Sequence, residues 1–186
     1  MEGYVCTNVS LLTEGNPRNS YAVFSKQLNG ENGVCITRLH PEYVIEKFGP
    51  MNAQFYWLSK MKDRSALSPN NISVLVKQVR KEVGEGRKMF FLDGLEYLLL
   101  WNDMNAIIGA LQDIDKMLVQ ADGSLMISID PLTFEESDLR KFCGCFPQVD
   151  LAKLSEGSRH TVADEPAGKG QIDAGLLVSK GLIATP

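Results

Sequence analysis

The sequence predicts an α/β domain with three layers, in which helices cover both faces of a mainly parallel central sheet. Short apolar segments alternate with segments that carry apolar residues at helical spacing, and this alternation continues to about residue 142. The central segment, residues 89–92, is apolar on both faces, which is typical of a strand inside a parallel sheet. Because each parallel strand needs a crossover to the next, the alternation favours a parallel sheet.

Strands are expected at residues 3–9, 33–37, 53–59, 89–92 and 124–129. Residues 10–18 and 60–67 are polar and are expected to be connections. The expected helices begin at residues that suit a first turn: Asn19 or Ser20, Pro41, Ser68-Pro69, Asn102 or Asp103, and Thr133 in a capping-box pattern. Apolar stripes predict their buried sides, and these include Tyr21, Phe24, Leu28, Val44, Ile45, Phe48, Leu75, Val79, Ile107, Leu111 and Ile114.

The chain is expected to divide into a core and a tail. The α/β core domain is predicted at residues 1–143, where the alternating pattern closes. The tail, residues 144–186, begins with small, polar and turn residues and is expected to be partly irregular. It also contains an apolar segment, residues 172–184, that could dock on the core.

The overall charge argues against two classes of partner. The net charge is −4 at pH 7 and the pI is about 5.2, whereas proteins that bind nucleic acid or anionic membranes carry a basic surplus. The longest apolar run, residues 97–101, is too short to span a bilayer, and the N-terminus lacks the pattern of a signal peptide. We therefore expect a cytoplasmic protein that binds neither nucleic acid nor a membrane.

The cysteines do not predict a metal or redox centre. Cys6 and Cys35 fall in predicted strands, where a thiol usually behaves as a small buried hydrophobe. Cys143 and Cys145 are separated by one residue, unlike the Cys-x-x-Cys pairs of redox and zinc sites. Only His40 and His160 could complete such a site, so no metal and no cofactor is expected.

The motifs of several enzyme classes are missing from the sequence. The connection that should cradle a phosphate, residues 10–20, has no Gly-Lys-Ser/Thr, and Lys169 is followed by no hydroxyl residue. Gly-x-Ser-x-Gly and Gly-x-Gly-x-x-Gly do not occur either. The sequence therefore favours a domain without catalytic activity over an enzyme.

A set of polar residues is nevertheless expected at one edge of the sheet. Arg38, Asp93 and Asp130 each follow a predicted strand, and the carboxyl ends of parallel strands form the edge where such sheets bind ligands. Ser20, at the start of the first helix, completes this candidate ligand-binding set. For Asp93 two interpretations stay open: its side chain bonds backbone N–H groups in the turn at Gly94, or it binds a ligand or metal.

Other conspicuous residues have ordinary explanations. Trp57 and Trp101 lie inside apolar runs and are expected in the core. Lys77, Arg80 and Lys81 lie away from the apolar stripe of their helix, as either a basic docking face or a solvated surface, and we favour the solvated surface.

Several short motifs together carry a resemblance to a known family. They are Tyr21-x-x-Phe24, Ile36-Thr-Arg38-x-x-Pro41, Trp57-Leu-Ser59, Ser68-Pro69, Leu92-Asp-Gly-Leu-Glu-Tyr-Leu98, Asn102 and Ile129-Asp-Pro131. In order and spacing they resemble the archaeal family catalogued as domain of unknown function 835, over roughly residues 3–142. The resemblance implies an archaeal protein and a sensory or regulatory module, alone or fused to signalling domains, with no established reaction.

The same order is similar, more distantly, to the RecA-like core of circadian-clock-type ATPases, which would make the fold P-loop-like without a Walker A motif. In this likeness the strand ending at Asp93 stands for the magnesium strand, and residues 10–20 stand for a shortened phosphate loop without its lysine. Arg38 stands where those enzymes place acids. The likeness leaves room for a degenerate site that binds without reacting.

Two functions follow as hypotheses. The first is a non-catalytic regulatory, signalling or protein-interaction domain, whose partner is itself, as a homodimer, or a cytoplasmic signalling protein. The alternative is a ligand-binding or nucleotide-binding domain with a degenerate phosphate site at the C-terminal edge of the sheet, where Arg38, Asp93 and Asp130 are expected.

Overall fold

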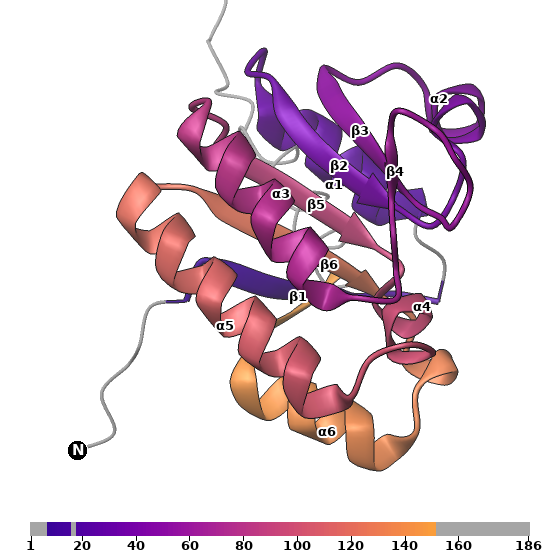
Figure 1. The fold of residues 1–186 in the computed structure, drawn as a ribbon, viewed down its shortest axis with the longest axis vertical. Coiled ribbons are helices and arrows are strands. Elements are labelled where there is room, and N and C mark those ends of the chain that lie inside the picture. Colours follow the sequence, from indigo (N-terminus) through magenta and orange to yellow (C-terminus); the bar gives the residue numbers. More distant parts are fainter. Residues whose placement is uncertain (1–6, 16–17, 152–186) are drawn as a thin grey trace, which may run out of the picture.

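In the part of the chain that the structure describes, seven parallel strands form a central sheet (Figure 1). The computed structural model describes residues 7–15 and 18–151. The strand order is β4-β3-β2-β5-β6-β1-β7. The strands are β1 (Val9–Thr13), β2 (Gly33–Thr37), β3 (Ala53–Leu58), β4 (Ala66–Leu67), β5 (Met89–Asp93), β6 (Ser124–Ile129) and β7 (Gln148–Asp150).

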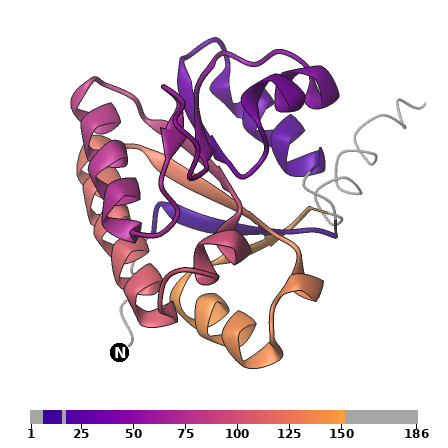
Figure 2. The same cartoon turned by 45° about the vertical axis from the view of Figure 1, so that its right-hand side comes forward.

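Helices cover both faces of this sheet (Figures 1 and 2). On one face lie α1 (Arg18–Leu28) and α2 (Pro41–Phe48); on the other lie α3 (Ile72–Gly84), α5 (Met104–Ala121) and α6 (Glu136–Cys145). Two short helices follow strand ends, α4 (Leu95–Leu99) after β5 and the 3-10 helix η1 (Pro131–Thr133) after β6. The predicted three-layer α/β fold with a parallel sheet is therefore confirmed.

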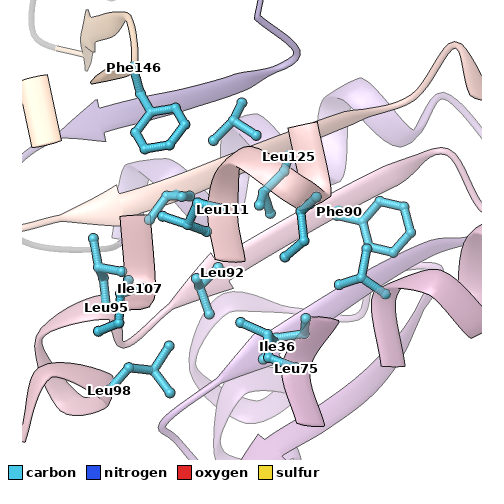
Figure 3. Close-up of a cluster of buried hydrophobic side chains, with 14 of the residues drawn as sticks. Ile36, Leu75, Phe90, Leu92, Leu95, Leu98, Ile107, Leu111, Leu125 and Phe146 are labelled. Carbon is cyan, nitrogen blue, oxygen red and sulfur yellow. The ribbon is translucent and has the colours of Figure 1, made fainter. Parts of the chain in front are cut away.

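The central strand β5 serves both hydrophobic cores. Phe90 and Leu92 point into the core beneath α3 and α5 (Figure 3). Phe91 points to the opposite face, where its ring lies 4.8 Å from that of Tyr21 and 5.3 Å from that of Phe24. The segment is apolar on both faces because helices bury both of them, as the sequence predicted.

The strand order creates a switch point between β2 and β5. The connection after β2 leads through α2 to β3, toward the β4 edge of the sheet. The connection after β5 leads through α4 and α5 to β6, in the opposite direction. Open α/β sheets bind ligands where neighbouring strands send their connections apart, so the ends of β2 and β5 are the first place to search for a site.

The first strand begins later than predicted. We expected a strand at residues 3–9 and a polar connection at 10–18, but β1 is Val9–Thr13 and α1 begins at Arg18. Leu11 and Leu12 are buried, and Leu11 pairs with Ile127 of β6, so tertiary pairing overrides the polar residues around them. Residues 3–6, including Cys6, lie outside the described part of the chain.

Two strands were not predicted. β4 lies inside the expected connection at residues 60–67 and pairs with the end of β3. β7 lies beyond residue 143, where the core was expected to end, and pairs with β1. Both are too short to show an alternating pattern, and only their neighbours in the sheet define them. The apolar segment at residues 172–184 lies outside the described residues.

Some helix details also differ from the prediction. The capping box at Thr133 is wrong: α6 begins at Glu136, and the Thr133 hydroxyl donates to the Asp130 carbonyl at 2.7 Å, because Asp130 and Pro131 start η1 there. Ile45 and Trp101, expected in the core, are 42% and 46% exposed, because α2 fully buries only Val44 and Trp101 lies beyond the end of α4 at Leu99. By contrast, β2 and β6 have the predicted bounds.

Candidate functional site

A buried carboxylate, Asp93, lies at the C-terminal end of β5 and is 3% exposed. One of its oxygens, Oδ2, accepts a hydrogen bond of 2.8 Å from the hydroxyl of Tyr21 on α1. The same hydroxyl lies 2.9 Å from Oγ1 of Thr37, the residue that pairs with Asp93 in β2. Three elements that are distant in sequence, α1, β2 and β5, thus meet in one polar cluster at the switch point.

Arg38, the residue after β2, covers this cluster from the solvent side. Its Nε lies 3.9 Å from Oδ1 of Asp93, and its Nη1 lies 2.6 Å from Oε1 of Glu96 on α4. Its side chain is 40% exposed, whereas those of Asp93 and Glu96 are 4% and 17% exposed. The guanidinium therefore balances two acids that are largely withdrawn from water.

Gly94 allows Arg38 to approach so closely. Its φ is +126°, in the region that side chains disfavour, and a Cβ here would lie 3.1 Å from Cβ of Arg38 and 3.2 Å from Cδ1 of Leu58. The backbone N–H of Arg38 donates to the Asp93 carbonyl at 2.9 Å. The backbone of the Asp-Gly pair, at the end of β5, therefore lies against Arg38, the first residue of the connection that follows β2.

Burial is the largest influence on the pKa values of Asp93 and Glu96. It raises the pKa of Asp93, while the hydrogen bond from Tyr21 and the charge of Arg38 oppose the rise and the charge of Glu14 adds to it. Burial likewise raises the pKa of Glu96, with Arg38 opposing. The pKa of the Tyr21 hydroxyl is raised by burial and then by the charge of Asp93, so Tyr21 remains a hydrogen-bond donor at neutral pH.

A second polar group lies at the start of α1. The backbone N–H of Ser20 donates to Oε1 of Glu14 at 2.9 Å, and the Ser20 hydroxyl donates to the same oxygen. The Ser20 Oγ also lies 3.2 Å from Oγ of Ser128, which pairs with Asp93 across β5 and β6. Within the described residues, Oε2 of Glu14 is buried without a hydrogen-bond partner. A backbone N–H group in the first turn of α1 therefore already donates a hydrogen bond to a carboxylate of the chain itself, that of Glu14.

The structure brings the candidate residues together only in part. Arg38 and Asp93 form one cluster, and Ser20 belongs to the neighbouring group that Ser128 links to it. Asp130 stands apart: its Oδ1 accepts from the N–H of Leu132 at 3.0 Å and caps η1. The Asp93 carboxylate accepts a hydrogen bond from the Tyr21 hydroxyl, whereas one of the two interpretations left open had it accept from the backbone N–H groups of the turn at Gly94.

Sequence reasoning missed Tyr21, Thr37 and Glu14 as members of the site. Tyr21 was assigned to the apolar stripe of its helix, which is correct for its ring, yet a buried tyrosine hydroxyl needs a partner and could have been matched to Asp93, the acid that ends the buried central strand. Nothing in the sequence marked Glu14 as a member of the site, because the position of its side chain depends on where β1 ends.

Other features lie away from this cluster. A cavity of about 410 Å³ between α3 and α5 is lined by Lys77 and Arg80, among others, on the face rather than the edge of the sheet. No three His, Cys, Asp or Glu side chains gather as a metal site within residues 7–15 and 18–151. Over the same part of the chain, the helices are all too short or too polar to cross a membrane.

Comparison with known families decides where the chain belongs. The model of the family described as "Protein of unknown function (DUF835)" matches residues 14–142. The chain is a member of the DUF835 family. The match to DUF835 begins at Glu14 and ends at Phe142 in α6, so both polar groups described above fall within it. A search among curated proteins gives no match.

Proposed function

We propose that this DUF835 domain is a non-catalytic regulatory or signalling module that acts through protein interactions. The observation that carries the proposal is that the oxygens of the Asp93 carboxylate already face polar groups of the chain itself. Its two oxygens face the Tyr21 hydroxyl and the Arg38 guanidinium, and the side chain is buried. A carboxylate that must hold a magnesium ion for phosphoryl transfer needs an oxygen open to the metal and its waters.

The start of α1 supports the same proposal. Phosphate-binding folds place a phosphate at the N-terminus of the helix that follows the first strand, where backbone N–H groups are free. Here the N–H of Ser20 in that turn donates to Glu14. A phosphate at this position would have to displace the Glu14 carboxylate and would be repelled by its charge.

We further propose that the core is RecA-like. Supporting this, β1 and β5 end at the same edge of the sheet with β6 between them, so the proposed phosphate connection and the proposed magnesium strand are neighbours in space. Arg38 pairs with Asp93 in this arrangement and substitutes a positive charge for an acid. The partners we propose for such a core are a second copy of the chain or a cytoplasmic signalling protein.

Nucleotide binding and turnover test the proposal directly. We expect no change in melting temperature with ATP, ADP or GTP, with or without magnesium, and no ATP hydrolysis. A real site at a hundred times its Kd would stabilise the protein by about 2.7 kcal/mol, which is easily seen. Turnover that disappears in Asp93→Asn but persists in Asp130→Asn, the matched change at another strand end, would overturn the proposal.

A ligand-binding or nucleotide-binding domain with a degenerate phosphate site at this edge is the second candidate. The observation that favours it is the position of Arg38, a half-exposed cation at the switch point between β2 and β5. A shift of the melting temperature by inorganic phosphate or a nucleotide that is lost in Arg38→Gln, and kept in the exposed Arg80→Gln, would establish this candidate instead.

A further inference from the structure

Exposed apolar side chains gather at the C-terminal edge of the sheet. Of the large hydrophobic residues that are exposed in the described part of the chain, four of seven follow strand ends. Leu132 of η1 is 91% exposed, Leu100 and Trp101 after α4 are 71% and 46% exposed, and Met61 after β3 is 67% exposed. Such a gathering at one edge differs from the scattered single residues that any protein surface shows.

The connection after β3 makes one end of this surface basic. Residues 60–64 hold Lys60, Lys62 and Arg64 against a single acid, and all of these side chains are exposed. Lys60 lies over the ring of Trp101, with its Nζ 3.1 Å from the ring centroid, so the basic connection touches the apolar residues after α4. Among the described residues, Lys62 and Arg64 enter no ion pair.

The other end of the surface is acidic. Leu132 is followed by Glu135 and Glu136, both exposed, at the start of α6. Glu135 occupies the N-cap position without a side-chain hydrogen bond to the helix, so its carboxylate is available to a partner. η1 follows β6 and α4 follows β5, and these two strands are neighbours in the sheet, so η1 and α4 lie at adjacent strand ends.

The order of these charges along the edge is self-complementary. The basic connection follows β3, the apolar residues follow α4 at the end of β5, and Leu132 with its acids follows β6, in the order in which these strands lie in the sheet (Figure 1). We call residues 60–64, 100–101 and 132–136 together the edge surface. A two-fold axis through residues 100–101 would place the basic end of one copy on the acidic end of the other, twice.

We infer that the edge surface binds a second copy of this chain in an isologous, two-fold contact. The inference rests on the proposed function, because it names the partner and the surface of an interaction module. Charge complementarity between the two ends of the same surface selects a second copy over an unrelated protein. The apolar middle would supply the buried centre of the interface and the charges its rim.

Charge-swap variants of the full chain test this arrangement. Lys62→Glu alone and Glu135→Lys alone should each weaken self-association about tenfold, because each change makes two contacts repulsive in a two-fold interface. Mixing the two variants should restore association as a heterodimer, since every altered charge then faces an opposite one. Sedimentation velocity at concentrations up to about 100 µM would resolve these states.

A matched apolar pair tests the centre of the surface. Leu132→Ser should weaken association about tenfold or more, because burying a leucine favours association and the contact occurs twice. Val119→Ser changes a 51% exposed residue near the end of α5, far from this edge, and should leave association unchanged. Both positions are exposed enough that the monomer should keep its melting temperature.

The outcomes separate this inference from the proposed function. A wild-type protein that remains monomeric throughout, for example because its own residues 172–184 or another protein covers the surface, would overturn the inference. A dimer whose association is unchanged by Leu132→Ser, Lys62→Glu and Glu135→Lys would also overturn the inference. Neither result bears on nucleotide turnover, and turnover that depends on Asp93 would overturn the proposed function while leaving a charge-swap dimer standing.

Discussion

Tyr21 donates its hydroxyl hydrogen to the buried carboxylate of Asp93 across the interface between α1 and β5. The bond joins the first helix to the central strand at the point where the sheet's connections diverge. Because the Nε of Arg38 lies 3.9 Å from the other oxygen, both oxygens of the carboxylate face groups of the chain itself. The energetic role of this arrangement can be measured independently of any ligand.

Removing the donor should destabilise the domain. Tyr21→Phe keeps the ring but leaves the buried Asp93 oxygen without its hydrogen bond, so we expect a loss of about 1–3 kcal/mol in the free energy of unfolding. Tyr43→Phe removes a hydroxyl whose only hydrogen bond among the described residues is exposed, and should change stability by less than about 0.5 kcal/mol. Urea unfolding of the three proteins gives the comparison. Equal midpoints would show that the Tyr21–Asp93 bond contributes nothing net.

Asp93→Ala separates a structural role from a metal-binding role. If Asp93 is structural, its removal takes one of two partners from both the Tyr21 hydroxyl, which keeps Thr37, and Arg38, which keeps Glu96, at a cost of about 1–3 kcal/mol. A metal ligand held among other acids would relieve repulsion on removal, so stability would stay the same or rise. We expect the loss, and we expect magnesium to shift neither protein in a melting experiment. Asp93→Asn, which keeps an oxygen acceptor for Tyr21, should lose less than Asp93→Ala.

The stability should depend on pH through Asp93. Burial raises the pKa of this carboxyl above its ordinary 3.8, so the folded state holds the proton more tightly than the unfolded state does. The associated stabilisation is complete below pH 3.8 and is lost as the pH rises through the folded-state pKa. Wild type should therefore lose stability relative to Asp93→Asn over that rise. Denaturant midpoints of both proteins, measured at several pH values, would show the wild-type midpoint falling relative to that of Asp93→Asn as the pH rises through the folded-state pKa; an unchanged offset between the two midpoints would contradict the shift.

Two glycines should respond to alanine with opposite signs. Gly94→Ala places a Cβ at a φ of +126° and close to Arg38 and Leu58, so we expect a loss of more than about 1 kcal/mol. Gly109 lies within α5, and a Cβ there would meet nothing within 4 Å among the described residues. Gly109→Ala should gain about 0.4–1 kcal/mol through helix propensity. Thermal unfolding of the two variants decides; stabilisation by Gly94→Ala would show that the close approach of Arg38 is not required.

β7 should contribute to the stability of the core. Phe146 and Leu151, which flank it, are buried, and β7 itself pairs with β1. A chain that ends after residue 151 should unfold cooperatively, whereas one that ends after residue 146 should be less stable by about 2 kcal/mol or more, since burial of Leu151 is lost. Denaturant unfolding of both chains tests this. Identical stability would place the end of the core before β7.

Most helices and strands could be predicted from the sequence, because the local hydrophobic pattern of these segments agrees with their burial in the structure. β2 is buried at every position, and the stripes of α3 and α5 follow the helical period, so pattern alone located these elements. β4 and β7 exist only through pairing with β3 and β1, and nothing local marks them. Residues 10–13 contain Leu11 and Leu12 among polar neighbours, and pairing with β6 decided their state.

For the site, the sequence located strand ends but not side-chain partners. Arg38 and Asp93 were expected to converge because parallel strands end at one edge, and they do. That Tyr21 would reach Asp93 depends on how α1 crosses the sheet, which periodicity does not specify. Asp130 was grouped with them for the same reason as Asp93, yet it turns away to cap η1, because a proline follows it.

The position of β1 has a consequence for how the chain is made. β1 is the first strand in sequence but lies between β6 and β7, so Val9 pairs with Leu125 and Leu12 pairs with Val149. On a ribosome, β1 therefore emerges long before either neighbour exists, with Leu11 and Leu12 ready to pair with any free strand edge. The β2–β3–β4 half of the sheet can assemble without it, whereas β1 must wait for almost the whole core. We expect this delay to make the nascent chain depend on chaperones, and we expect the long-range pairing of β1 to set the rate of refolding.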